Sequence, residues 1–115
     1  MILMSSYVST KIDAQTEITT NAGSFKQFTV QRQASGVVLN WSVSNSNIIE
    51  FGIERSYDGA YFETIGSCPC NGTSMHRYTD ARAKTGAIYY RITAIKADKS
   101  VEISAAESVR TEKRS

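Results

Sequence analysis

The residues of this chain that could do chemistry are few, and the closest pair is Cys68 and Cys70, with only Pro69 between them. Thiolate metal sites usually use about four ligands, and only His76, the single histidine, lies nearby in the sequence. Redox dithiols usually have two intervening residues, and a disulfide across one residue closes a strained, reducible ring. Two loop thiols without chemistry, a disulfide, and a metal or redox site are therefore the alternatives.

The acidic residues and the histidine favour structural roles over catalysis. Asp58, Asp80 and Asp98 each lie at an expected turn, and no loop carries oxygen ligands at the alternating positions that calcium sites use. No serine or cysteine nucleophile is evidently paired with His76, so we expect a histidine on the surface or on an edge strand. The residues thus predict a non-catalytic protein with no cofactor and no metal.

Two tyrosines could instead form a ligand platform. Tyr57 and Tyr61 flank the turn signal Asp58-Gly59, and strand parity places Tyr61 and Phe62 on opposite faces. Phe62 is the better core candidate, which leaves Tyr57 and Tyr61 exposed for stacking on a sugar. The alternative is a pair of exposed tyrosines without a ligand, which is common on protein surfaces.

Composition limits the class of protein. The chain has 115 residues, 41% hydrophobic and 21% charged, with a net charge of +2, which suits one soluble domain that folds without a metal or disulfide. The basic residues are interspersed up to a short basic tail, so no stripe for nucleic acid forms. No apolar run approaches the roughly 20 residues that span a bilayer, so we expect neither nucleic-acid binding nor membrane insertion.

Short runs rich in β-branched and aromatic residues, separated by glycines and polar turns, predict about seven strands. The expected strands cover residues 25–31, 37–43, 49–56, 61–65, 76–79, 87–95 and 101–105. This pattern is typical of an antiparallel β-sandwich. We assign the sandwich to residues 25–110, a polar tail to 111–115, and an arm, linker or extra strand to 1–24.

Alternation within these strands predicts the core. One expected strand turns Val37, Leu39, Trp41 and Val43 inward, and the next turns Ile49, Phe51, Ile53 and Arg55 to one face. In the strand at 87–95, alternation with Ile92 favours Tyr90 over Tyr89 as the inward tyrosine. The expected core is therefore built around Trp41, Phe51, Ile53, Tyr90 and Ile92.

Five short sequence motifs, which follow one another along the chain, then suggest a family. They are Leu39-Asn40-Trp41, the segment from Phe51 to Gly59, the segment from Phe62 to Gly66, Tyr78-Thr79-Asp80, and the segment from Gly86 to Ile92. From Phe25 to Val109, the chain resembles the fibronectin type III-like modules of large exported Bacteroidetes proteins. The Cys-Pro-Cys sequence and the segment 1–24 depart from that pattern.

The resemblance implies a fibronectin type III or immunoglobulin-like sandwich that serves as a spacer or adhesion-type interaction module. It implies a secreted or cell-surface location. The apolar start at residues 1–6 is too short for a signal-peptide core, so we expect either a protein made without a signal or, in preference, a domain excised from a larger chain. The implied partners are neighbouring domains or another surface protein, and an unpaired edge strand would allow a weak dimer besides a monomer. The alternatives are a carbohydrate-binding module using Tyr57 and Tyr61, and a small redox or metal protein using Cys68 and Cys70.

Overall fold

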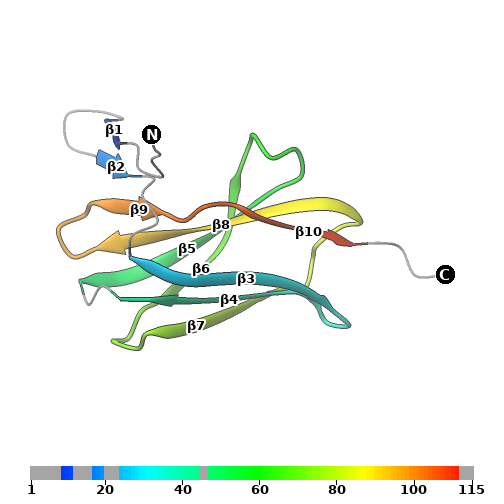
Figure 1. Cartoon of the computed structure of the whole chain (residues 1–115), viewed down its shortest axis with the longest axis horizontal. Helices are drawn as coiled ribbons and strands as arrows, with labels where there is room; N and C mark the ends of the chain where they lie inside the picture. Colours follow the sequence, from blue (N-terminus) through cyan, green and yellow to red (C-terminus); the bar gives the residue numbers. More distant parts are fainter. Residues whose placement is uncertain (1–8, 12–16, 20–23, 45–46, 112–115) are drawn as a thin grey trace.

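The computed structural model describes residues 9–11, 17–19, 24–44 and 47–111, in which every regular element is a β-strand. The strands form two sheets that face each other across a shared core, which confirms the predicted all-β sandwich (Figure 1). Within the described ranges, there is no helix of the length and apolar character needed to cross a membrane. The larger sheet contains β1 (Ser9–Lys11), β2 (Glu17–Thr19), β5 (Ile48–Ser56), β6 (Glu63–Pro69), β8 (Gly86–Lys96), β9 (Val101–Ile103) and β10 (Glu107–Thr111). The smaller sheet contains β3 (Phe25–Gln33), β4 (Gly36–Val43) and β7 (Met75–Asp80).

The long strand β8 organises the larger sheet. It pairs with β5 on one side and with both β9 and β10 on the other, always antiparallel. The segment 1–24, left open between an arm, a linker and an extra strand, contributes β2, which pairs in parallel with β9, and β1, which pairs with β2. The rest of that segment, apart from Ser24, lies outside the described residues.

Alternating side chains from both sheets fill the core, as the pleat of a strand requires. The ring of Trp41 packs edge-on against Phe51, with 5.4 Å between ring centroids. Burial of such aromatic side chains is a main source of stability in a sandwich. The buried apolar cluster includes Val37, Leu39, Trp41, Val43, Ile48, Phe51, Ile53, Cys70, Ile88, Tyr90, Ile92 and Ala94.

A bulge in β5 changes one predicted position. Ile49 was expected to face inward with Phe51, but its side chain is 53% exposed and Ile48 is buried instead. The pairing of β5 with β8 shifts register between Ile48 and Glu50, so one extra residue reverses the alternation at this point. A prediction that assumes strict alternation of side chains along the strand cannot reveal an inserted residue.

The second corrected region is β6. The strand was expected at 61–65 with a loop from Cys68 to Gly72, but β6 begins at Glu63 and includes Cys68 and Pro69. The loop before it, from Tyr57 to Phe62, is longer than a two-residue hairpin turn. At the C-terminal end the structure adds β10, which ends at Thr111, one residue beyond the predicted limit of the sandwich.

The carboxylate of Asp80 joins the two sheets. It was interpreted only as a turn residue, and its Oδ1 does accept a hydrogen bond from the backbone N–H of Arg82 (3.1 Å). Its side chain is also buried, and accepts hydrogen bonds from Arg55 Nη1 (2.9 and 3.0 Å) and from the Tyr90 hydroxyl (2.7 Å). Asp80 ends β7 of the smaller sheet, whereas Arg55 and Tyr90 belong to β5 and β8 of the larger one.

Tyr90, the tyrosine predicted to face inward, is fully buried and bonds to the other sheet. The Tyr90 hydroxyl donates to the Asp80 carboxylate rather than to nearby backbone. Burial first, and then this hydrogen bond, raises the pKa of Tyr90 above its ordinary value. The hydroxyl therefore stays protonated and remains a donor over the usual pH range.

A second bond between the sheets is made at the edge strands. The Tyr78 hydroxyl of β7 donates to the carbonyl oxygen of Ile65 in β6 (3.2 Å). The ring crosses Gly66 so closely that a Cβ there would come within 2.8 Å of two ring carbons. Glycine at this position is therefore required for the contact.

Replacement of Asp80 by alanine should lower the free energy of unfolding by about 3–5 kcal/mol, because it leaves a mostly buried guanidinium with only Glu63, 3.9 Å away, as an acidic partner. Tyr90→Phe should cost less, about 1–3 kcal/mol, since Arg55 still satisfies the carboxylate. Chemical denaturation of each variant measures these losses. Asp98→Ala removes an exposed turn acid and is the matched control. Equal losses for Asp80→Ala and Asp98→Ala would contradict a special role for the buried carboxylate.

Candidate functional site

The loop between β5 and β6 is held in one shape by its own polar groups. Asp58 Oδ1 accepts hydrogen bonds from the Ser56 hydroxyl (2.8 Å) and from the backbone N–H groups of Ala60 (2.8 Å) and Tyr61 (2.9 Å). Ser56 Oγ in turn accepts from the N–H of Gly59 (2.8 Å). The bond from Tyr61, followed by that from Ala60, lowers the pKa of Asp58 to about 2. The loop is therefore organised around an ionised carboxylate.

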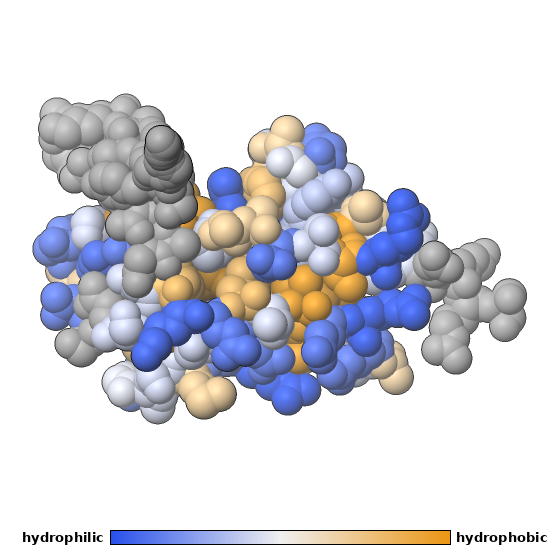
Figure 2. Space-filling view, viewed as in Figure 1, coloured by the Kyte–Doolittle hydropathy of each residue, from blue (hydrophilic) through white to orange (hydrophobic). Residues whose placement is uncertain are grey.

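This loop presents the two tyrosines that the sequence suggested as a platform. It projects from the body of the sandwich in Figures 1 and 2. The Tyr61 side chain is 72% exposed and that of Tyr57 is 39% exposed. The Tyr57 hydroxyl accepts a hydrogen bond from the N–H of Lys84 (3.1 Å), and the Arg55 guanidinium lies 5.2 Å from its ring centroid. Tyr61 is thus the freer of the two rings for stacking.

Both tyrosines border one small depression of about 190 Å³. Arg55, Asp58 and Glu63 also line it, and Glu63 lies 3.9 Å from the Arg55 guanidinium. The site therefore combines aromatic faces with carboxylate oxygens, which can accept hydrogen bonds from the hydroxyl groups of a sugar. Sequence reasoning did not assign Arg55 to this site, although its inner-face position in β5 already indicated a buried partner.

Phe62, the expected core residue of this loop, is only half-buried and lies outside the buried cluster. The Arg91 guanidinium covers its ring at 4.1 Å, and Arg91 Nε donates to Glu54 Oε1 (2.6 Å). The ring is therefore shielded by a cation and an ion pair rather than by apolar side chains. It contributes no second free aromatic face beside Tyr61.

The Cys68–Cys70 segment lies at the other end of β6. Cys70 belongs to the buried core, Cys68 packs against it, and both thiols are unpaired. Burial, followed by the proximity of Cys70 and Glu50, raises the pKa of the Cys68 thiol. Since the thiolate is the reactive form, this environment disfavours nucleophilic chemistry at Cys68.

His76 cannot serve as a base for the neighbouring thiol in this arrangement. Its Nε2 lies 2.9 Å from the carbonyl oxygen of Thr73 and 3.8 Å from Cys70 Sγ. A carbonyl oxygen can only accept, so Nε2 carries the proton and has no lone pair for the thiol. The ring is stacked against Trp41, 5.7 Å between centroids, on the edge strand β7. Among the described residues, no group of three or more histidine, cysteine or acidic side chains is placed to hold a metal ion.

Comparison with known proteins identifies relatives only at the level of the fold. No model of a protein family and no curated protein matches the chain. Among solved structures, the pectate lyase Pel3 from Pectobacterium carotovorum is similar with a TM-score of 0.62 and 21% identity, over 76% of this chain and 27% of the lyase. The pectate lyase PelI from Erwinia chrysanthemi, in complex with tetragalacturonic acid, gives 0.61 and 16%, over 71% of this chain and 27% of that one.

A β-1,2-glucanase from Parabacteroides distasonis is also similar, with a TM-score of 0.54 and 20% identity, over 86% of this chain and 15% of the glucanase. At these identities the likeness shows a shared fold alone. The chain matches about a quarter or less of each of these three proteins.

The Asp58 carboxyl should titrate with a midpoint near pH 2, measured by NMR of its side-chain carbon. The pKa is lowered in the folded protein from about 3.9. The stabilising contribution is therefore complete above about pH 4 and is lost as the pH falls toward 2. Asp58→Asn should flatten the pH dependence of stability in that window. A midpoint near 4 would show that the three donors do not bind the carboxylate in solution.

Both thiols should react slowly with a disulfide reagent in the folded protein, at least about tenfold more slowly than in denaturant, because Cys70 is buried and partial burial favours the protonated form of the Cys68 thiol. Thiol counting with and without guanidinium chloride checks this. The variant Cys68→Ser assigns the remaining reactivity to Cys70. Equal rates in both conditions would favour the redox alternative.

Proposed function

We propose that the chain is a non-catalytic module of a larger exported or cell-surface protein, of the fibronectin type III-like kind, that positions neighbouring domains or contacts another surface protein. One observation carries this proposal: the groups that could do chemistry serve the fold. Asp80 is bound by Arg55 and Tyr90, and His76 is stacked on Trp41 with its Nε2 bonded to a carbonyl. Asp58 organises its own loop.

The comparisons support a modular role. Three of the similar structures are named as two pectate lyases and a glucanase, and in each of these three the matched part is a minor share of the chain. A sandwich that recurs as a small part of polysaccharide-active enzymes fits a spacer or accessory module. Fold alone does not decide function. The proposal therefore also depends on the observation that the polar side chains named above are engaged in contacts within the fold.

The test is incubation of the purified chain with polygalacturonate and with β-1,2-glucan, followed by measurement of new chain ends. We expect no release above that of a heat-denatured sample. Release that persists through repeated purification and is lost in a point variant of an exposed polar residue would overturn the proposal.

Carbohydrate binding at the β5–β6 loop is a second candidate, favoured by the 72% exposure of Tyr61 on a loop fixed by Asp58. Stacking of a sugar on this ring, with Glu63 and Asp58 as acceptors, would not require the loop to rearrange. Because binding to a preorganised site avoids the entropy cost of ordering a loop, even one free ring can contribute measurably.

Affinity electrophoresis against neutral polysaccharides tests this candidate. If Tyr61 stacks on sugar, Tyr61→Ala should weaken retardation about tenfold, a loss typical of one aromatic contact. Tyr57→Phe, which removes only the hydroxyl, should have a smaller effect. Met75→Ala is the control, because Met75 is 75% exposed on β7 and lies outside the loop. Unchanged mobility of the wild type across the panel would remove this candidate and leave the spacer role in place.

A further inference from the structure

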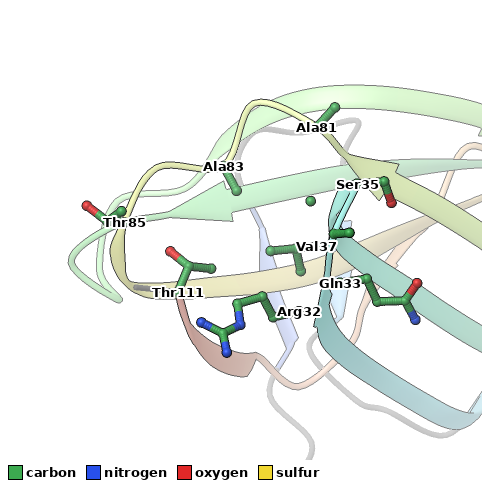
Figure 3. A pocket seen from close by; sticks show the side chains of 10 residues that line it. Arg32, Gln33, Ser35, Val37, Ala81, Ala83, Thr85 and Thr111 are labelled. Carbon is green, nitrogen blue, oxygen red and sulfur yellow. The ribbon is translucent and has the colours of Figure 1, made fainter. Parts of the chain in front are cut away.

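A larger depression lies at one end of the sandwich, where the two sheets part (Figure 3). Its walls come from the β3–β4 turn, the connection from β7 to β8 and the end of β10, and its volume is about 470 Å³. That volume is within the range of ordinary small-ligand sites. The depression includes no residue of the Tyr57–Phe62 loop.

Arg32 is the one charged side chain that lines this depression, and the strand register shows which way it faces. Arg32 lies opposite Val37, and Val37 lies opposite Asp80, in adjacent strands of the smaller sheet. Directly opposed residues share a face of a sheet. Val37 and Asp80 are both buried between the sheets, so Arg32 belongs to the inner face as well, at its open end. Figure 3 shows its guanidinium extending toward Thr111 of β10.

Within the described part of the chain, Arg32 forms no ion pair. Asp80 is in register with Val37 and Arg32 across the smaller sheet, but its carboxylate already accepts hydrogen bonds from Arg55 and Tyr90. The Arg32 side chain is therefore exposed at the mouth of the sandwich, and none of the described acidic residues pairs with its guanidinium.

The rest of the lining is neutral. Val37, Ala81 and Ala83 supply an apolar wall, and Ser35 and Thr85 supply hydroxyl groups. The Thr111 hydroxyl donates to the carbonyl oxygen of Lys84, which leaves its lone pairs as acceptors. A single guanidinium in a neutral pocket suits one carboxylate, whereas a doubly charged phosphate usually has more donors or cations around it. The apolar wall and the hydroxyls suit a ligand body with a carbon-rich face and hydroxyl groups.

We propose that this depression binds a uronic-acid unit of an acidic polysaccharide, with Arg32 pairing with the sugar carboxylate. The sugar ring lies against the apolar wall, and one of its hydroxyl groups meets Thr111. The choice of a polysaccharide rests on the proposed role beside polysaccharide-active domains. The carboxylate specificity rests on the pocket alone.

The test is isothermal titration of the folded chain with polygalacturonate, with galacturonate monomer and with a neutral galactan. Arg32→Gln should weaken binding of the acidic ligand at least about tenfold, as expected for the loss of one charge-assisted contact. Arg77→Gln is the matched control, because Arg77 makes the same change in charge but lies on β7 opposite Asn40, on the outer face. It should leave the affinity nearly unchanged. The galactan should not bind at this site.

Binding of the polymer but not the monomer would identify an extended polysaccharide as the ligand, and equal affinity per unit would identify a single uronate. Equal weakening by Arg32→Gln and Arg77→Gln would overturn the proposal in favour of non-specific attraction. Binding that Tyr61→Ala abolishes and Arg32→Gln spares would also overturn it, and would place the ligand on the β5–β6 loop. Absence of binding by the wild type would overturn the pocket assignment without touching the spacer role, which the turnover assay tests separately.

Discussion

The buried carboxylate of Asp80 is the interaction on which the rest of this sandwich depends. An ionised acid between two sheets is strongly unfavourable unless donors surround it. Here Arg55, Tyr90 and the N–H of Arg82 supply those donors, and they come from β5, β8 and the turn after β7. Because the partners belong to different sheets, this one requirement fixes how the sheets meet at this end of the molecule. Apolar packing around Trp41 stabilises the fold without imposing so specific an alignment.

The hydrogen-bond network around Asp80 also lies next to both candidate binding surfaces, the β5–β6 loop and the depression beside the β3–β4 turn. Arg55 directly precedes Ser56, whose hydroxyl accepts a hydrogen bond from Gly59 of the β5–β6 loop. The Arg55 guanidinium lies over the Tyr57 ring of the same loop. On the other side, the backbone of Asp80 lies against Gly36 of the β3–β4 turn. Both candidate binding surfaces therefore adjoin the buried ionic contact, while Ser56 and Asp58 fix the shape of the β5–β6 loop itself. Such loops can vary in their exposed residues with little effect on the fold.

The sequence predicted most of the framework because alternation and turn residues reflect local geometry. The inward series in β4 follows from the period of a strand, and a change of chain direction at Asp58-Gly59 follows from the positive φ of Gly59, although the loop there is longer than a tight hairpin turn. What local patterns could not show were non-local events. The exposure of Ile49 comes from a bulge against β8, and the burial of Asp80 depends on an arginine 25 residues away. The alternation pattern did not predict β10, because only one of its five residues, Val109, has an apolar side chain. This strand is stabilised by its pairing with β8.

Two arginines at the same end of the sandwich have different environments. Arg55 and Arg32 both extend from the inner face of a sheet toward the same end of the sandwich. Arg55 is mostly buried, pairs with Asp80, and is explained entirely by the alignment of the sheets. Arg32 is exposed at the open end of the sandwich and has no such acid in the described structure, so its guanidinium is accessible to a ligand in the depression. The alignment of the sheets therefore accounts for Arg55, whereas Arg32 is the side chain that the proposed carboxylate ligand would bind.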